Sequence, residues 1–295
     1  QNKGNDTQVV TSAGEHAYTM GDSPLWNIDM RLLTARLQDL GRAQGVRYLD
    51  HFELGELQVD ADGRPTSVDF QQGREASEGG PGRIEAKLFV DASGTRQELL
   101  RRVDALSADC PAVPEDRYCL ALSEAARIDD REAALAFLAQ QKSRPGESTN
   151  TFGVDRGFSI LLVSVDDEVA HIDIVIGTAG GEKSPRQILA EFRQREPWVG
   201  ARVYGGEAKI PLRRPYDRLA APGIALVGDA ACMVFSTHGS GVGMGMAAGK
   251  LLADAVANHD DPGGLAATWA YQATFQRRFG GRLAGMSILQ RFFQQ

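Results

Sequence analysis

The sequence predicts an α/β fold in two parts, and three observations support this prediction. Residues 224–227 form a short, continuous apolar run followed by a glycine-rich turn and a helical pattern of small residues, as in a parallel strand buried on both faces. Residues 46–90 contain strand-like segments separated by polar turns, which is typical of a β-meander. Residues 116–210 mix strand-like and helical segments, so we expect a second sheet with helices on one face.

The first elements along the chain are a helix and the meander. In residues 29–44, leucines recur at three- and four-residue steps with charged residues between them. This spacing predicts an amphipathic helix that ends between Gly41 and Gly45. The meander strands are expected at residues 46–59, 66–71 and 83–90, with a Gly/Glu/Ser-rich loop at 73–82.

The rest of the chain alternates between helices and strands. A helix is expected through Leu99 and Val103, and Pro111 marks a boundary after it. Ser184 followed by Pro185 is typical of a helix start. Strands are expected at residues 118–123, 158–165 and 171–177, helices at 130–141, 184–195 and 244–258, and a helical stretch interrupted by Gly280-Gly281 at 265–295.

These segments predict how the chain divides into domains. The main part is discontinuous and consists of residues 1–105, which include the meander, and residues 207–262. A substrate-binding sheet domain is expected between them at residues 106–206. Residues 263–295 are expected to form a C-terminal helical extension.

Composition limits the functional classes. The chain has 295 residues, of which 42% are hydrophobic and 24% charged, so it can bury a sizeable core. Its net charge of −7 argues against nucleic acid as a partner, and it contains no apolar run long enough to form a transmembrane segment. Three cysteines without a CxxC pair and five scattered histidines indicate neither a disulfide framework nor a metal site, and they fit a reducing, cytoplasmic location.

The most informative motif is the glycine-rich turn Gly239-Ser240-Gly241-Val242-Gly243. Glycines allow the backbone to approach a ligand closely, and the N-terminus of the following helix favours an anionic group such as a pyrophosphate. Close packing of a helix on a strand, without any ligand, explains the same glycines equally well.

Asp229 shifts this balance toward a ligand. A carboxylate directly after a buried strand is costly to hold without partners. It can accept hydrogen bonds from ribose-type hydroxyls or from the N–H groups of the next helix. The alternative is that Asp229 only caps local backbone.

Further positions near the turn have two interpretations each. His238 is able to contact a ligand and to titrate near neutral pH, although a loop histidine is more often solvated. Cys232 is expected to be a buried packing residue rather than a nucleophile. Arg213 and Arg214 either bind an anionic group or, as is more common, pair with nearby acids on the surface.

Gly228-Asp229-Ala230-Ala231, seven residues, and then Gly239-Ser240-Gly241-Val242 resemble the second FAD motif of a flavoprotein superfamily, the one that holds geranylgeranyl reductases and aromatic-ring monooxygenases. The resemblance implies that Asp229 meets ribityl or ribose hydroxyls of FAD. It also implies that N–H groups near Gly241 and Val242 face the pyrimidine edge of the flavin. The cofactor-binding residues that it implies are Gly228, Asp229, Ala230, Gly239, Ser240, Gly241, Val242 and Gly243, together with Asp91 and Gly94.

Other segments resemble the same superfamily in the same order. Asp91-Ala92-Ser93-Gly94 is similar to its middle motif, and residues 209–215 are similar to the strand before the second FAD motif. The helix at 29–44 is similar to the helix that precedes the meander. Together these segments cover most of residues 25–258, and their order is more specific than any single motif.

The chain departs from the superfamily at three places. The opening strand, GxGxxG turn and helix, which bind the ADP half of FAD in family members, have no counterpart, because the segment before residue 25 contains only Gly4, Gly14 and Gly21. We therefore expect a fragment of a longer flavoprotein. Ser236 replaces the usual loop proline, and residues 157–163 lack the Tyr-x-Trp-x-Phe-Pro motif of geranylgeranyl reductases.

The resemblance implies a Rossmann-like FAD-binding domain without its N-terminal βαβ unit, a β-meander, and an inserted antiparallel substrate sheet with helices on one face. It implies an FAD-dependent oxidoreductase that acts on a small apolar molecule, with NAD(P)H as electron donor and either alkene reduction or hydroxylation as the reaction. The residues name no catalytic group and no oligomeric state. The alternative is a non-catalytic, cofactor-free fragment, whose exposed sheet edge predicts aggregation.

Overall fold

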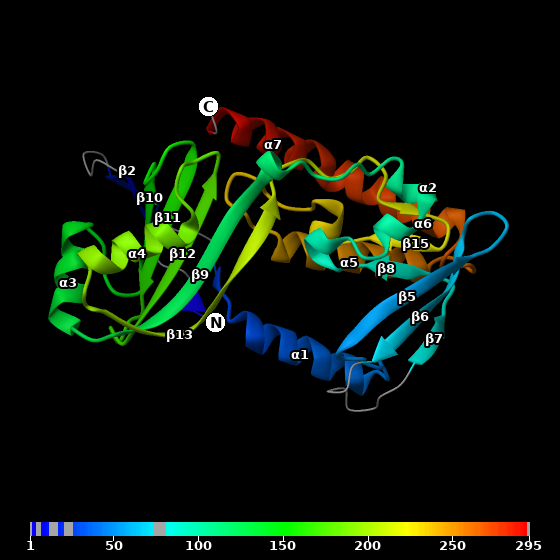
Figure 1. Ribbon diagram of the computed structural model, residues 1–295, viewed down its shortest axis with the longest axis horizontal. Coiled ribbons are helices and arrows are strands. Elements are labelled where there is room, and N and C mark those ends of the chain that lie inside the picture. Colours follow the sequence, from blue (N-terminus) through cyan, green and yellow to red (C-terminus); the bar gives the residue numbers. More distant parts are fainter. Residues whose placement is uncertain (1, 4–6, 12–16, 21–25, 73–80, 294–295) are drawn as a thin grey trace. The chain divides into compact units, whose positions relative to one another are not determined.

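The computed structural model describes residues 2–3, 7–11, 17–20, 26–72 and 81–293. The chain divides into two compact units (Figure 1): unit 1 comprises residues 1–44, 118–209 and 293–295, and unit 2 comprises residues 45–117 and 210–292. The glycines at positions 4, 14 and 21, and most of the loop at 73–82, lie outside the described residues.

Unit 1 is built on a seven-stranded sheet with the strand order β13-β9-β12-β11-β10-β2-β3. Strands β9 to β12 pair antiparallel, whereas β10 and β2 pair parallel. The strand bounds are β1 Asn2–Lys3, β2 Thr7–Thr11, β3 Ala17–Met20, β4 Trp26–Asn27, β9 Tyr118–Ile128, β10 Ser148–Phe152, β11 Phe158–Val165, β12 His171–Ala179 and β13 Val199–Pro211. The helices of this unit are α1 Met30–Ala43, α3 Arg131–Gln140 and α4 Pro185–Arg195.

Helices α3 and α4 cover one face of this sheet (Figure 1). Alternate residues of β12, namely Ile172, Ile174 and Ile176, are fully buried in this core, as expected for a strand with one face inward. Both helices start where the sequence predicts, because the Asp130 side chain caps α3 and Ser184 forms a capping box at α4. The predicted antiparallel sheet with helices on one face is confirmed, except for its one parallel pair.

Helix α1 is formed as predicted but buries none of its residues. The Asp29 side chain accepts hydrogen bonds from the N–H groups of Arg31 and Leu32 and so starts the helix. The predicted leucine stripe is exposed, with Leu32 at 71% and Leu40 at 53% exposure. The amphipathic pattern therefore marks a face that stays uncovered in the part of the chain that the structure describes.

Unit 2 combines the predicted meander with a short sheet and several helices. Strands β5, β6 and β7 pair antiparallel, and a second sheet has the order β14-β15-β8, in which β15 and β8 run parallel. The predicted apolar strand forms β15 and is fully buried. The bounds are β5 Phe52–Val59, β6 Pro65–Gln72, β7 Pro81–Glu85, β8 Phe89–Asp91, α2 Asp104–Ser107, β14 Ala220–Ala221, β15 Ile224–Leu226, α5 Val242–Ala257, α6 Leu265–Phe275 and α7 Gly281–Phe293.

Three predicted elements differ from the structure. The segment at 83–90 forms two strands, β7 and β8, which belong to different sheets. The predicted helix through Leu99 is replaced by 3₁₀ turns at Gly94–Arg96 and Leu100–Arg102, and between them Gln97 adopts a left-handed backbone conformation, with a φ of +53°, that does not continue a helix. Gly280-Gly281 does not interrupt the last helical stretch, since a π-helical turn at Gln276–Gly280 joins α6 to α7.

The compact units do not follow the predicted domain bounds. Strands β2 and β3 belong to the sheet of unit 1, so residues 1–44 group with residues 118–209 and not with the meander. The C-terminal helices group with unit 2 instead of forming a separate extension, because α6 packs on α5. The functional roles that we predict for residues 1–105, 106–206 and 207–262 stay predictions.

The Tyr271 side chain links α6 to the end of β15 through a buried hydrogen bond. Its side chain is fully buried, and its hydroxyl donates to the backbone carbonyl oxygen of Leu226 at 2.7 Å. Tyr271→Phe removes this donor and is expected to lower the free energy of unfolding by about 1–2 kcal/mol, measured by urea denaturation. The exposed Tyr204 is the control, and Tyr204→Phe should change this free energy by less than about 0.5 kcal/mol. Equal losses in the two variants would contradict the assignment.

Candidate functional site

The site lies where two parallel strands of unit 2 end side by side. Leu226 of β15 is in register with Asp91 of β8, and the Val227 N–H donates to the Asp91 carbonyl oxygen at 3.0 Å. The two loops that follow, at 91–97 and 228–231, leave the sheet at the same edge. Ligands of open parallel sheets bind at this carboxyl edge of the strands.

Asp229 is a half-buried carboxylate without a partner. Within the described residues no donor lies at hydrogen-bond distance from its side chain, and burial alone raises its pKa above the ordinary value. A Cβ atom placed at Gly241 would lie 3.0 Å from Asp229 Oδ1, so the carboxylate faces the start of α5. The structure therefore holds an acceptor that its own backbone does not use.

The start of α5 offers donors. Val242 is the first helical residue, the N-cap is Gly241, and no side chain caps the first turn. A Cβ atom at Gly243 would meet no atom within 4 Å, and the same holds at Gly228, which adopts a φ of +64° that disfavours other residues. The open space beside Gly228 and Gly243 thus lies near two kinds of polar group, the uncapped N–H groups of α5 and the Asp229 carboxylate.

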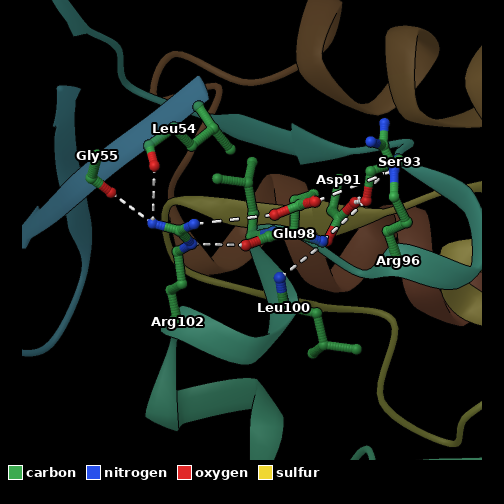
Figure 2. Close-up of polar contacts among 9 residues, drawn as sticks. Leu54, Gly55, Asp91, Ser93, Arg96, Glu98, Leu100 and Arg102 are labelled. Carbon is green, nitrogen blue, oxygen red and sulfur yellow. Dashed lines mark hydrogen bonds and ion pairs between the residues drawn. The ribbon is translucent and has the colours of Figure 1, made fainter. Parts of the chain in front are cut away.

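The Asp91 carboxylate has its hydrogen-bond partners inside the chain (Figure 2). Its side chain is 1% exposed and accepts hydrogen bonds from the N–H and hydroxyl of Ser93 and from the N–H groups of Leu99 and Leu100, at 2.6–3.0 Å. The carboxylate therefore shapes the loop around Gly94. The cofactor contact that the resemblance implies for Asp91 stays a prediction.

Arg102 links this part of the chain to the meander through hydrogen bonds (Figure 2). Arg102 donates to the carbonyl oxygen of Glu98 at 3.0 Å and to the carbonyl oxygens of Leu54 and Gly55 on β5. Arg96, two residues after Gly94, is exposed and contacts only Glu98 among the described acids, at 4.0 Å. The position of the Gly94 turn thus depends on contacts made by residues far from it in the chain.

Gln97 joins the two loops of the site, and sequence reasoning did not find it. It is buried with a φ of +53°, and its side-chain amide donates to the Ala230 carbonyl oxygen at 2.9 Å and to the Tyr216 hydroxyl at 3.1 Å. The Tyr216 hydroxyl donates in turn to the carbonyl oxygen of Pro111. The sequence does not indicate this role, because Gln97 stands in a charged segment and its function depends on which carbonyl group its side chain reaches in the folded structure.

The remaining candidates have clear surroundings. Cys232 is fully buried, and burial raises its pKa to about 12, so it packs and is no nucleophile. Arg214 forms the expected ion pair with Asp217, whereas the Arg213 guanidinium stacks over the Tyr216 ring at 4.3 Å. His238 is exposed at its side chain, yet it contacts both a ring and a hydroxyl of its own turn.

Sequence comparison finds relatives of one kind. Digeranylgeranylglycerophospholipid reductase of Methanothrix thermoacetophila is 32% identical over 135 residues, which are 43% of this chain and 33% of the relative. Digeranylgeranylglycerophospholipid reductase 1 of Methanococcoides burtonii is 23% identical over 215 residues, which are 71% of this chain and 49% of the relative. The chain thus matches between a third and a half of the length of these curated relatives. No family model matches the chain.

Solved structures with the same fold include several flavin enzymes. A geranylgeranyl bacteriochlorophyll reductase-like protein of Thermoplasma acidophilum has a TM-score of 0.78 at 13% identity and covers 100% of this chain and 72% of its own. A flavin-dependent brominase has a TM-score of 0.65 at 15% identity over 98% of this chain and 71% of its own. A tryptophan 6-halogenase of Streptomyces toxytricini has a TM-score of 0.61 at 17% identity, covering 87% and 45%.

The fold, with two loops at the edge of a parallel strand pair and a glycine turn before a helix, is the fold of these flavin enzymes. The sequence relatives narrow this likeness, because the chain is similar in sequence to digeranylgeranylglycerophospholipid reductases. Among the described helices, none is long and apolar enough to cross a membrane.

Proposed function

We propose that this chain carries the flavin-binding part of an FAD-dependent oxidoreductase. The observation that carries the proposal is the Asp229 carboxylate, which is half-buried, has no partner among the described residues, and faces the uncapped start of α5. A buried acceptor beside unused donors is costly unless a ligand pairs with both. The residues therefore fit a polar ligand with hydroxyl donors and carbonyl acceptors, as FAD has.

Each residue of the site has a part in holding FAD. Asp229 would accept hydrogen bonds from the ribityl or ribose hydroxyls, and N–H groups near Gly241 and Val242 would face the pyrimidine edge of the flavin. Gly228 and Gly94 leave room for the cofactor, and Gly239 shapes the turn. The Ala230 carbonyl anchors Gln97 and keeps the two loops together. When bound, the flavin supplies the redox chemistry, and the chain positions it and limits access of water.

We propose a small apolar substrate and NAD(P)H as the electron donor. The sheet of unit 1 supports the first point, because the face opposite α3 and α4 presents Phe152, Ile160, Leu162 and Val175 in register on neighbouring strands. Phe152 and Val175 are about two-fifths exposed, at 40% and 37%. The sequence relatives, which are named as phospholipid reductases, also support it.

The reaction is reduction of an alkene or hydroxylation. The lipid reductases among the sequence relatives favour alkene reduction. A second candidate, a chain without cofactor or activity, is favoured by the exposed leucines of α1.

The test is whether the purified chain binds flavin and what it then does. After incubation with FAD and removal of the excess, we expect the visible absorption bands of bound flavin, bleached by NADH or NADPH under anaerobic conditions. Oxygen uptake that depends on an added apolar substrate would indicate hydroxylation, and substrate saturation without oxygen would indicate alkene reduction. A chain that neither retains FAD nor quenches the fluorescence of added FAD or riboflavin would contradict the proposal and support the second candidate.

A further inference from the structure

The turn before the glycines holds His238 in a defined orientation. Its ring stacks on Phe235, with the ring centroids 5.4 Å apart and 24° between the planes. Nδ1 lies 2.9 Å from the hydroxyl oxygen of Ser240. The His238 side chain is exposed, yet the Phe235 ring holds one face of the imidazole and the Ser240 hydroxyl holds one of its nitrogens. A histidine that only faces solvent does not need these two contacts.

The backbone of the same turn is closed by hydrogen bonds. The Phe235 carbonyl oxygen accepts from the N–H groups of His238 at 3.2 Å and Gly239 at 2.8 Å, and the Phe235 N–H donates to the Ser240 carbonyl oxygen at 3.1 Å. The Thr237 hydroxyl contacts the sulfur of Met286 on α7 at 3.5 Å. The imidazole therefore belongs to a closed turn that ends two residues before α5 begins.

The second ring nitrogen is available to a ligand. Nε2 of His238 has no hydrogen-bond partner among the residues that the structure describes. When the Ser240 hydroxyl donates to Nδ1, the proton of the neutral ring resides on Nε2, which then acts as a donor. Partial burial lowers the pKa of His238, so the neutral ring prevails near pH 7. The Ser240 hydroxyl thus orients the imidazole ring.

We propose that His238 contacts the flavin ring, with Nε2–H as the donor and Ser240 and Phe235 as the residues that position it. This inference rests on the proposed flavin site. The turn then presents two kinds of donor, the N–H groups at the start of α5 and the imidazole N–H, next to an open space at Gly243. The flavin ring matches them because its pyrimidine portion carries two carbonyl oxygens and the unprotonated nitrogen N1, all of which accept hydrogen bonds.

The test compares His238→Phe, His238→Gln and Ser240→Ala with the wild-type chain. The dissociation constants for FAD and for riboflavin and the reduction potential of bound flavin are measured. His238→Phe is expected to raise both dissociation constants about fivefold, the loss of one hydrogen bond, and to make the potential more negative, because a donor to the ring favours its reduced, electron-rich form. His238→Gln keeps a donor and should recover most of both effects, and Ser240→Ala should fall between them.

His259→Gln is the matched control. His259 follows the C-terminal end of α5, where its Nδ1 contacts the Ala255 carbonyl oxygen. A helix of 16 residues places it about 24 Å from the glycine turn. This variant should bind both flavins like the wild type and leave the potential unchanged.

The outcomes separate this inference from the proposed function. If the wild-type chain binds flavin and His238→Phe has the same dissociation constants and potential, the contact is refuted and the flavin site stands. If the wild-type chain binds neither FAD nor riboflavin, both proposals fail together. A change that appears equally in His259→Gln also refutes the contact, since it would reflect a general effect on the fold.

Discussion

Asp229→Asn is expected to weaken FAD binding about tenfold and, at the same time, to stabilise the flavin-free chain. The loss of affinity follows because a hydrogen bond to a charged acceptor contributes about 1.5–3 kcal/mol, and about 1.4 kcal/mol corresponds to a factor of ten. The gain in stability follows because the half-buried carboxylate has no partner among the described residues that would offset its desolvation. Titration of flavin fluorescence measures the first effect, and thermal denaturation without flavin measures the second.

The stability effect of Asp229 has a defined dependence on pH. Burial raises its folded-state pKa above the ordinary 3.8, so the folded state binds the proton more tightly than the unfolded state does. Below pH 3.8 the side chain is protonated in both states, so its burial does not lower the free energy of unfolding. As the pH rises through the raised pKa, the side chain ionises in the folded state and the free energy of unfolding falls. The melting temperatures of wild type and Asp229→Asn should coincide in acid and separate toward neutral pH, with the variant higher. A variant less stable than the wild type at pH 7 would mean that Asp229 has a structural partner.

Asp91→Ala is expected to lower the free energy of unfolding by at least about 3 kcal/mol, because it leaves several buried donors without an acceptor. These donors are the N–H groups of Ser93, Leu99 and Leu100 and the Ser93 hydroxyl, all of which the carboxylate accepts. Chemical denaturation measures the loss. The affinity for flavin should fall only in proportion to the fraction of molecules in which the loop at 91–97 is unfolded. A high flavin concentration should restore part of the lost free energy of unfolding, because flavin binds the folded state.

An exposed aspartate provides the control for Asp91. Asp254 pairs with Lys250 on the surface of α5 at 2.8 Å, and exposed pairs of this kind contribute about 0.5 kcal/mol. Asp254→Ala should therefore leave both stability and flavin binding nearly unchanged. If the Asp91→Ala variant were as stable as Asp254→Ala, the Asp91 carboxylate would not be required for the structure of its loop, and a direct contact with the cofactor would be the better explanation of this residue.

The two aspartates explain which part of the site was predictable. Both follow an apolar strand and stand beside small residues, and the resemblance assigns both to the cofactor. In the structure the Asp91 carboxylate has partners in its own loop, whereas the Asp229 carboxylate has none among the described residues. A carboxylate's partners depend on the path of the chain after it, and for Asp91 they lie two, eight and nine residues further along.

The exposed helix face and the mixed sheet show the same limit for the fold. Hydrophobic periodicity correctly predicted α1, yet it does not say what covers the leucines, and no described residue buries them. The pairing of β2, Thr7–Thr11, with β10, Ser148–Phe152, joins segments far apart in the sequence. No local pattern encodes such a pairing, since each strand supplies only its own alternation.

The sequence by itself determined the fold class, the meander, the apolar strand β15, the glycine turn and the helix that follows it. These features depend on local chemistry, such as side-chain spacing, helix starts and the backbone freedom of glycine. Only the tertiary structure decided that the Asp91 carboxylate has partners in its own loop, that Asp229 has none among the described residues, that Gln97 joins the loops and that His238 is held by Phe235 and Ser240. Each of these depends on which groups meet in space, because a hydrogen bond requires its two partners within about 3 Å of each other.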